Sequence, residues 1–558
     1  MKFFSNTVLA IISSVTVLAC TVAGTQVAVN SNSTASVADK TDDSKSEPAP
    51  PAVYLDTTME RATGRTIQVK SGGNLQAAFD SAAQGDVIAI EAGATFTGNF
   101  TLPAKPASGN KWIIIRSSAA DEKLPPPGTR VSPKDSQLMP KLASTNADPV
   151  LRTAPGAHHY RFIGIEFQAA PAATINYGLI LLGDGSGKQN SLESVPHDLV
   201  IDRCYIHGNE TGNLRRGIAL NSARTAIIDS HISDCHEIGA DSQAICGWNG
   251  PGPFKIVNNY LEGAGENFML GGADPSIKDL VMSDIEFRRN TCSKPLSWKM
   301  GHATYAGKRW SVKNIFELKN ARRVVIDGNV FENSWLDAQV GFAILFTPRN
   351  QEGGAPWSTV EDVSFTNNIV RHAAGGVNIL GRDDNHPSGQ SRRILIKNNL
   401  FEDVGGAAWG GNGRFLQITE TDHVIIDHNT IIHTGNIITA YGKPSTNFVF
   451  TNNFMPHNQY GVIGDGAGIG NVTLNQYFPN CVFKKNVIAG GRNSVYPADN
   501  FFPASIADAQ FIDQAKSDYR LGDSSPYKKA GTDNKSIGCD MDAMKAAASS
   551  LESARSSL

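Results

Sequence analysis

Several residue classes are scarce in this chain of 558 residues. Cysteine occurs 7 times, aromatic residues make up 8%, and basic and acidic residues nearly balance at 50 and 53. The balanced charge gives no global field that would attract nucleic acid, so a nucleic-acid partner is not expected. No two cysteines have the Cys-x-x-Cys spacing of a zinc site. Beyond residue 20, no run is long and apolar enough to span a bilayer.

The N-terminus carries an export signal. Lys2 precedes an apolar run from Val8 to Leu18, which is followed by Ala19-Cys20. A short basic region, a short apolar region and small residues form a secretory signal peptide, predicted over residues 1–20. The stretch Val17-Leu-Ala-Cys20 also resembles a bacterial lipoprotein cleavage box, so ordinary cleavage and lipidation of Cys20 are two alternatives. The protein is expected to be exported, whether extracellular, periplasmic or anchored to the outer membrane through a lipid on Cys20.

One phrase recurs along most of the chain. Glycine is abundant at 53 residues, and short alternating apolar stretches end in Asn, as in Val325-Ile-Asp-Gly-Asn-Val-Phe331. The Asn falls at positions separated by 24 to 39 residues: 259, 290, 329, 368, 399, 429, 453 and 486. A fixed motif with variable spacing is typical of a coil of short strands whose loops differ in length. Period-two alternation makes each phrase a strand, and the Asn suits the turn after it.

These patterns divide the chain into four parts. Residues 21–52 are rich in Ser, Thr, Ala, Asp and Pro and are predicted to be a disordered linker. Residues 53–540 are predicted to form one right-handed parallel β-helix, an all-β solenoid, with an amphipathic helix at residues 75–83 capping its first coil. Residues 541–558 are expected to form a C-terminal helix and tail. A two-sheet β-sandwich is the alternative, but ten copies of one phrase disfavour it, the eight with Asn and two earlier copies that end near Cys204 and Ser230. A monomer is expected.

The stacked Asn positions resemble those of the pectate-lyase-like superfamily of right-handed parallel β-helices. That resemblance implies an enzyme or binding protein that holds a long polysaccharide along the outside of the coil.

A second strand on each rung identifies the working face. In Ile315-Phe-Glu-Leu-Lys319, Phe316 and Leu318 are expected to fill the coil, so Glu317 and Lys319 project outward as exposed residues. Arg349 and Arg382 follow on the next rungs, which makes a basic column beside acidic residues of earlier rungs. Such a groove suits an anionic sugar chain, although each charge alone could simply be solvated.

The chemistry favoured by such a groove is β-elimination on a uronate. A cation on the carboxylate stabilises the intermediate formed when the C5 proton is removed. The predicted catalytic residues are Lys319, Glu317, Arg349, Lys299 and His236. The predicted substrate-binding residues are Arg382, Trp248, Trp298 and Asn267. Asp241 and Glu266 are predicted ligands of Ca²⁺.

A narrower resemblance concerns the alginate lyase and chondroitinase B family. The stretches Gly263-Ala-Gly-Glu-Asn-Phe268 and Ile315-Phe-Glu-Leu-Lys-Asn-Ala321 are similar to its core. The resemblance implies that Glu266 belongs to a calcium-binding segment and that Lys319 stands near a catalytic Arg. The family's base Lys has no counterpart, so the resemblance leaves Lys299, His236 or His302 as the base, or a different chemistry.

Two other functions stay open. A β-helical glycoside hydrolase would use paired carboxylates, for which Asp234 with Asp241 or Glu266 are candidates. A surface β-helix without catalysis would only bind an acidic polysaccharide. Only elimination produces an unsaturated uronate, which absorbs ultraviolet light.

Overall fold

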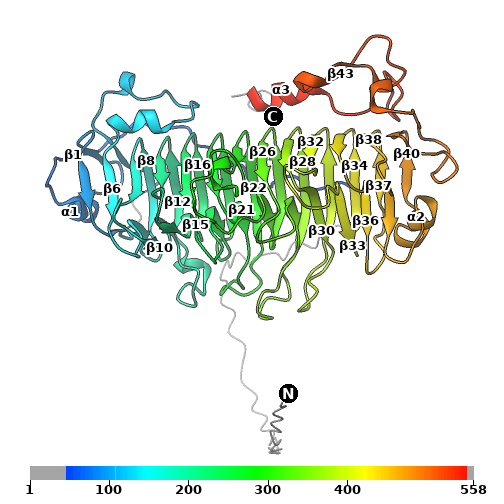
Figure 1. Cartoon of the computed structure of the whole chain (residues 1–558). Helices are drawn as coiled ribbons and strands as arrows, with labels where there is room; N and C mark the ends of the chain where they lie inside the picture. The colour runs from blue at the N-terminus through cyan, green and yellow to red at the C-terminus, as the bar shows by residue number, and fades with distance from the viewer. Residues whose placement is uncertain (1–45, 107–108, 550–558) are drawn as a thin grey trace, which may run out of the picture. The chain divides into compact units, whose positions relative to one another are not determined.

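The computed structural model describes residues 46–106 and 109–549. The predicted signal peptide, most of the predicted linker and the end of the tail lie outside the described residues. Three long sheets contain 14, 13 and 12 strands, and neighbouring strands within them are parallel. Sheet A runs from β1 (Thr66–Val69) to β40 (Val482–Lys484), sheet B from β3 (Thr95–Thr97) to β41 (Val487–Ala489), and sheet C from β4 (Phe100–Leu102) to β39 (Val462–Gly464). The predicted right-handed parallel β-helix is confirmed (Figure 1).

Most rungs contribute one strand to each sheet, so residues far apart in sequence become neighbours. On the rungs used below, sheet B contains β20 (Tyr260–Gly263) and β23 (Thr291–Ser293). Sheet C contains β21 (Glu266–Leu270), β24 (Phe316–Leu318) and β27 (Phe342–Phe346). Apolar side chains at alternate positions fill the coil, including Phe268, Phe316 and Phe331 at 0% exposure.

The predicted Asn column is present. The backbone N–H and the Nδ2 of Asn329 both donate to Oδ1 of Asn368, at 2.9 Å each. Asn368 in turn donates to Asn399 at 2.8 and 3.1 Å. The column begins with Ser230, whose N–H donates to Asn259, and it ends one position beyond the repeat, at Asn500. Each Asn side chain thus pairs backbone groups that the turn would otherwise leave buried without partners.

Both ends of the coil carry a helix. The first coil is covered by α1 (Leu75–Ser81), which buries Leu75, Ala78 and Phe79, as the sequence predicts. The helix α2 (Asn471–Tyr477) buries Leu474 and Tyr477 and contacts β39 at the other end. Closing the ends keeps apolar core and strand edges away from water.

The C-terminal segment leaves the coil and returns along its outside (Figure 1). It holds an antiparallel pair, β42 (Phe511–Asp513) and β43 (Asp518–Leu521), and α3 (Met541–Ser549). The hydroxyl of Tyr519 donates to Glu402 at 2.9 Å, and the N–H of Asp540 donates to Asn398. The range predicted for the β-helix, residues 53–540, therefore includes a C-terminal segment that lies against earlier rungs and adds no rung of its own.

The first described residues form a strap along sheet A. The N–H groups of Ala49 and Ala52 donate to the side chains of Asp362 and Asp284, at 3.0 and 2.7 Å. Further on, Arg161 donates to the carbonyl of Thr57 at 2.8 Å. Residues 46–52, the described part of the predicted linker, thus lie against the coil.

The six cysteines of the described chain are free, and five of them are buried. In the part of the chain that the structure describes, no helix is long and apolar enough to cross a membrane.

Candidate active site

Five charged residues gather on the outer side of sheet C. We call them the carboxylate–lysine cluster: Asp241, Glu266, Lys313, Glu317 and Lys319. Phe316 and Leu318 point into the coil at 0% exposure, so Glu317 points outward, as the alternation predicts. Glu317 stands between Met269 and Leu345 of the neighbouring rungs.

Glu317 is held by three side chains. The amide of Asn314 donates to Oε2 at 2.9 Å, and the hydroxyl of Thr347 donates to Oε1 at 3.2 Å. The Nζ of Lys319 lies 3.6 Å from the same Oε1. The prediction that this pair is exposed is wrong, because the side chains of Glu317 and Lys319 are only 4% and 16% exposed. An outward direction does not mean solvent exposure where loops fold over the sheet.

Glu266 is buried, and only one of its two carboxylate oxygens has a hydrogen-bond partner among the described residues. Its Oε2 accepts a hydrogen bond from Gln243 at 2.8 Å, while its Oε1 has no partner among the described residues. Burial, with the nearby charges of Glu317 and Asp241, raises the pKa of Glu266 to about 7. A carboxyl group with such a pKa can gain or lose a proton near neutral pH.

Lys319 remains a cation in this setting. Burial on its own would lower the pKa of Lys319, but the carboxylates of Glu317 and Glu266 outweigh it, so the pKa lies above its ordinary value. A protonated amine cannot accept a proton. Of the two roles predicted for Lys319, base or carboxylate clamp, the electrostatics favour the clamp.

The predicted calcium ligands do not by themselves fit the ion. Asp241 is paired with Lys313 at 2.5 Å, and the positive charge of Lys319 acts on Glu266. Neither belongs to a set of three acidic or His side chains with ligand atoms within 4.8 Å of one another in the described chain. Two ammonium groups therefore already balance these carboxylates, whereas calcium would need several more oxygen ligands.

Such a three-ligand set does occur on sheet A, formed by His159, His197 and Asp198. Arg224 already donates to both oxygens of Asp198, at 2.9 and 2.7 Å, and its Nη2 lies 2.7 Å from His197 Nδ1. A cation thus occupies the position that a metal would take.

The two predicted arginines lie beyond the cluster and are engaged by acids. The N–H of Arg349 donates to the carbonyl of Lys319 at 2.9 Å, which places it on the next rung. Its guanidinium pairs with Asp383 at 2.7 Å and with Asp384. Arg382 donates to the carbonyl of Ser388 at 2.9 Å and lies 3.6 Å from Glu420. Either arginine would have to exchange an acidic partner for a substrate carboxylate.

Three predicted site residues have structural roles instead. His236 is fully buried and stacks on Trp310 with ring centroids 3.7 Å apart, and burial lowers its pKa to about 4. Asn267 is also fully buried and donates to two backbone carbonyls. The indole of Trp248 donates to the carbonyl of Gly185 at 2.9 Å and pins that loop. The predictions that His236 is a base and that Asn267 contacts substrate are wrong, because neither reaches the surface.

Beside the cluster, loops form a cavity of about 220 Å³ lined by tryptophans. Trp298, Trp335 and Trp409 contribute its aromatic walls, together with Lys299 and Arg309. Arg309 pairs with Asp337 at 2.6 Å, and Asp337 also accepts from the N–H of Val312, one residue before Lys313. Predicted residues Trp298 and Lys299 therefore belong to this cavity, whose lining does not include Glu317 or Lys319.

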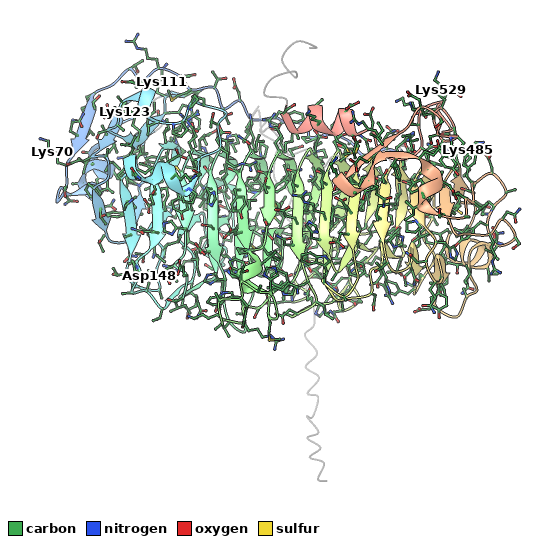
Figure 2. The ribbon with its side chains drawn as sticks, turned by 45° about the horizontal axis from the view of Figure 1, so that its top comes forward. Lys70, Lys111, Lys123, Asp148, Lys485 and Lys529 are labelled. Atoms are coloured by element: carbon green, nitrogen blue, oxygen red, sulfur yellow. The ribbon has the colours of Figure 1, made fainter. Side chains whose placement is uncertain are left out.

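A second, basic cavity of about 470 Å³ lies at the C-terminal end of the coil. Figure 2 shows Lys485 and Lys529 near one another there. Lys485 is paired with Asp499 at 2.7 Å.

Sequence reasoning missed two lysines of this region. Lys313 ends a long loop, and Lys294 follows β23 in a Ser-Lys-Pro stretch that carries no catalytic motif. Lys294 is nevertheless fully buried next to the segment that holds Glu266. Asp234, proposed for a hydrolase, lies on sheet B in β17 (His231–Cys235) and not in the cluster.

No family model matches this chain. No curated protein matches it either. Among solved structures, it is similar to the PL6 family alginate lyase AlyGC, with 14% identity, a TM-score of 0.48, and coverage of 85% of this chain and 58% of that one. The chain thus spans less than two thirds of that lyase.

Two other similar structures have different activities. One is the catalytic unit of a GH87 α-1,3-glucanase from Streptomyces thermodiastaticus, with 12% identity, a TM-score of 0.46, and coverage of 77% and 70% of the two chains. The other is PfbA, a surface adhesin of Streptococcus pneumoniae, with 11% identity, a TM-score of 0.46, and coverage of 70% and 86%. Since a fold does not fix an activity, the function has to be argued from the residues of the site.

Proposed function

We propose that this protein is an exported polysaccharide lyase that cleaves an acidic, uronate-containing polysaccharide at the carboxylate–lysine cluster. The observation that carries the proposal is the position of Lys319 on the outer side of sheet C, 3.6 Å from Glu317 and beside the buried Glu266. Burial would lower the pKa of Lys319, but the neighbouring carboxylates raise it, and burial raises the pKa of Glu266 to about 7. The cation offers a partner for the uronate carboxylate, and the carboxyl group offers proton transfer near neutral pH.

Each residue has a defined part in the elimination. The ammonium of Lys319 pairs with the uronate carboxylate and stabilises the negative charge that develops when C5 loses its proton. Ionised Glu266 takes up that proton through an intervening water, because Glu266 is 1% exposed and its Oε1, which has no partner among the described residues, does not reach the surface. The C5–H electron pair forms the C4=C5 double bond, and the C4–O4 bond breaks with its electrons on O4. A proton from solvent completes the new hydroxyl group.

The tryptophan cavity supports a polymeric substrate. Trp298, Trp335 and Trp409 offer flat apolar faces, on which a sugar ring can stack, within a volume of about 220 Å³. Met300 and Leu336 at its rim are 62% and 51% exposed, which is unusual for large apolar side chains. A chain held at Lys319 would then place a further sugar in this cavity.

Lys319→Met tests the proposal. We expect elimination to fall at least ~100-fold, because the variant keeps the length of the side chain but loses the charge that stabilises the intermediate. Purified protein is screened against acidic polysaccharides, and the unsaturated uronate is followed by ultraviolet absorbance. Lys443→Met is the matched control, since Lys443 is paired with Glu420 but is 74% exposed. Undiminished cleavage by Lys319→Met would move the active site elsewhere.

Calcium is tested separately. Because Lys313 is paired with Asp241 and the charge of Lys319 lies near Glu266, we expect cleavage to survive thorough chelation. Loss of cleavage on chelation, restored by added calcium, would show that the predicted metal is needed.

A hydrolase is the second candidate, because Glu266 and Glu317 are neighbouring carboxyl groups and the pKa of Glu266 is raised. New reducing ends without ultraviolet absorbance would identify hydrolysis. Binding without any cleavage would identify a surface protein that only holds polysaccharide. Export, and a lipid on Cys20 where it is added, would place either activity outside the cytoplasm.

A further inference from the structure

Lys294 is buried completely in a cage of oxygen atoms. It follows β23, and its side chain has 0% exposure. Its Nζ donates to the carbonyl oxygens of Gly263, Ala264 and Gly265, at 2.5, 3.0 and 3.1 Å. A fourth oxygen, Oδ1 of Asn267, lies 3.0 Å away. A lysine is almost never fully buried unless it is paired, and none of these four partners is charged.

The oxygen cage requires the charged form of the amine. An ammonium has three N–H donors and no lone pair, so it can face several acceptors at once. A neutral amine would turn its lone pair toward one of the oxygens. Burial lowers the pKa of Lys294 to about 7, although the negative charge of Glu266 opposes this shift, so the amine is mostly charged only below neutral pH. The distances of 2.5 to 3.1 Å fit N–H···O hydrogen bonds, whereas calcium would draw most of its ligands closer.

The cage is formed by the turn that carries Glu266. This turn, residues 263–267, joins β20 of sheet B to β21 of sheet C on one rung. It is tightly packed, because a Cβ on Gly263 would lie 2.1 Å from the carbonyl oxygen of Glu266, and one on Gly265 would lie 2.7 Å from that of Ser242. Three successive carbonyl groups therefore converge inside the protein, and their partial negative charges repel one another unless a cation lies between them.

We propose that Lys294 is a built-in cation, whose tethered ammonium occupies an oxygen cage that would otherwise need a free monovalent ion. It acts as a positioning residue, because the turn it holds fixes Glu266 in the carboxylate–lysine cluster. This second part rests on the proposed function, whereas the cage itself does not. Without the side chain, the cage offers four neutral oxygens to an ion of similar size, such as ammonium.

Chemical rescue tests this role. Lys294→Ala removes the amine and leaves room for an ion, so its melting temperature should fall by several degrees and rise again, saturably, with ammonium chloride. Sodium chloride at equal ionic strength should not restore it. Lys294→Met is the matched control: it fills the space of the hydrocarbon stem, so it should be destabilised without rescue. The wild-type protein should respond equally to the two salts.

Two results of the melting measurements would contradict the proposed role of Lys294. A Lys294→Met variant as stable as the wild type, or a Lys294→Ala variant that ammonium does not stabilise, would overturn the proposal. If Lys294→Ala fails to fold, refolding is attempted in each salt. Soluble protein recovered only with ammonium supports the cage, and no recovery in either salt overturns it.

The melting measurement needs no substrate, so it separates this proposal from the lyase. If ammonium stabilises Lys294→Ala but the wild-type protein cleaves no polysaccharide, the built-in cation is supported and the proposed lyase activity is rejected. If the wild type does cleave, ammonium should also restore turnover to Lys294→Ala. Thermal rescue without restored turnover would reject the positioning role alone.

Discussion

Glu262 lies on the outer face of sheet B and is only 9% exposed. Its Oε1 accepts a hydrogen bond from the hydroxyl of Tyr260 at 2.7 Å, and its Oε2 accepts from the N–H of Asp234 at 3.2 Å. Burial, with the charge of Asp234, raises the pKa of Glu262 from 4.5 to about 7. At residue scale, this group therefore couples folding to pH without belonging to the cluster.

The sign of the coupling gives a prediction for Glu262→Gln. Between pH 4.5 and 7 the folded protein binds a proton at Glu262 that the unfolded chain releases, so stability falls as pH rises through this range. Glutamine cannot ionise. We expect the variant to match the wild type below pH 4.5 and to be more stable above pH 7, by on the order of 3 kcal/mol.

Denaturant unfolding across this pH range measures the effect. Glu352→Gln is the control, because Glu352 is exposed and should leave the pH profile of the wild type unchanged. Parallel profiles for Glu262→Gln and the wild type would mean that Glu262 ionises normally in the folded protein.

At the scale of the element, the Asn column joins the rungs. Each member accepts from the rung before it and donates to a carbonyl of that rung, as Asn368 does with Asn329 and with the carbonyl of Ile326. A turn that recurs on many rungs thus depends on one side chain in each.

Asn368→Ala should be strongly destabilising. It leaves the N–H of Asn329 and the carbonyl of Ile326 buried without their partner, and each such group costs roughly 1–3 kcal/mol. Thermal or denaturant unfolding should show the loss. Asn493→Ala is the control, because Asn493 is exposed and outside the column. Equal stability of both variants would mean that water or a local shift replaces the column's hydrogen bonds.

At the scale of the whole described chain, two segments run along the coil across several rungs. The C-terminal segment contacts Glu402 and Asn398, and the N-terminal strap contacts Asp362, Asp284 and Arg161. In a solenoid each rung otherwise touches only its neighbours. Such straps connect distant rungs and are expected to make unfolding more cooperative.

Removing the strap tests this. A chain that begins at residue 61 should melt at a lower temperature than one that begins at residue 46, because it loses the bonds of Ala49, Ala52 and Thr57. About 1 kcal/mol for each bond is a reasonable scale. Circular dichroism should show the same strand content in both chains. Identical melting curves would show that the strap does not contribute to the stability of the coil.

The sequence by itself determined the coil. Period-two alternation and the spacing of Asn259 to Asn486 are local signals, and in a solenoid local repetition implies stacking. The same alternation gave the correct directions of Phe316, Glu317 and Leu318. It therefore placed Glu317, Lys319 and Glu266 in one region, even though Glu266 lies in β21 and the other two lie in or directly after β24.

Only the tertiary structure decided which of these residues are buried and charged. Loops of unequal length fold over sheet C, so Asn314 and Thr347 hydrogen-bond to Glu317 and help to bury it. His236 is buried against the ring of Trp310. No periodicity encodes such packing. The pKa of Glu266 and the hydrogen bonds around Lys294 both depend on groups that are distant in sequence. These groups come together only when the rungs stack.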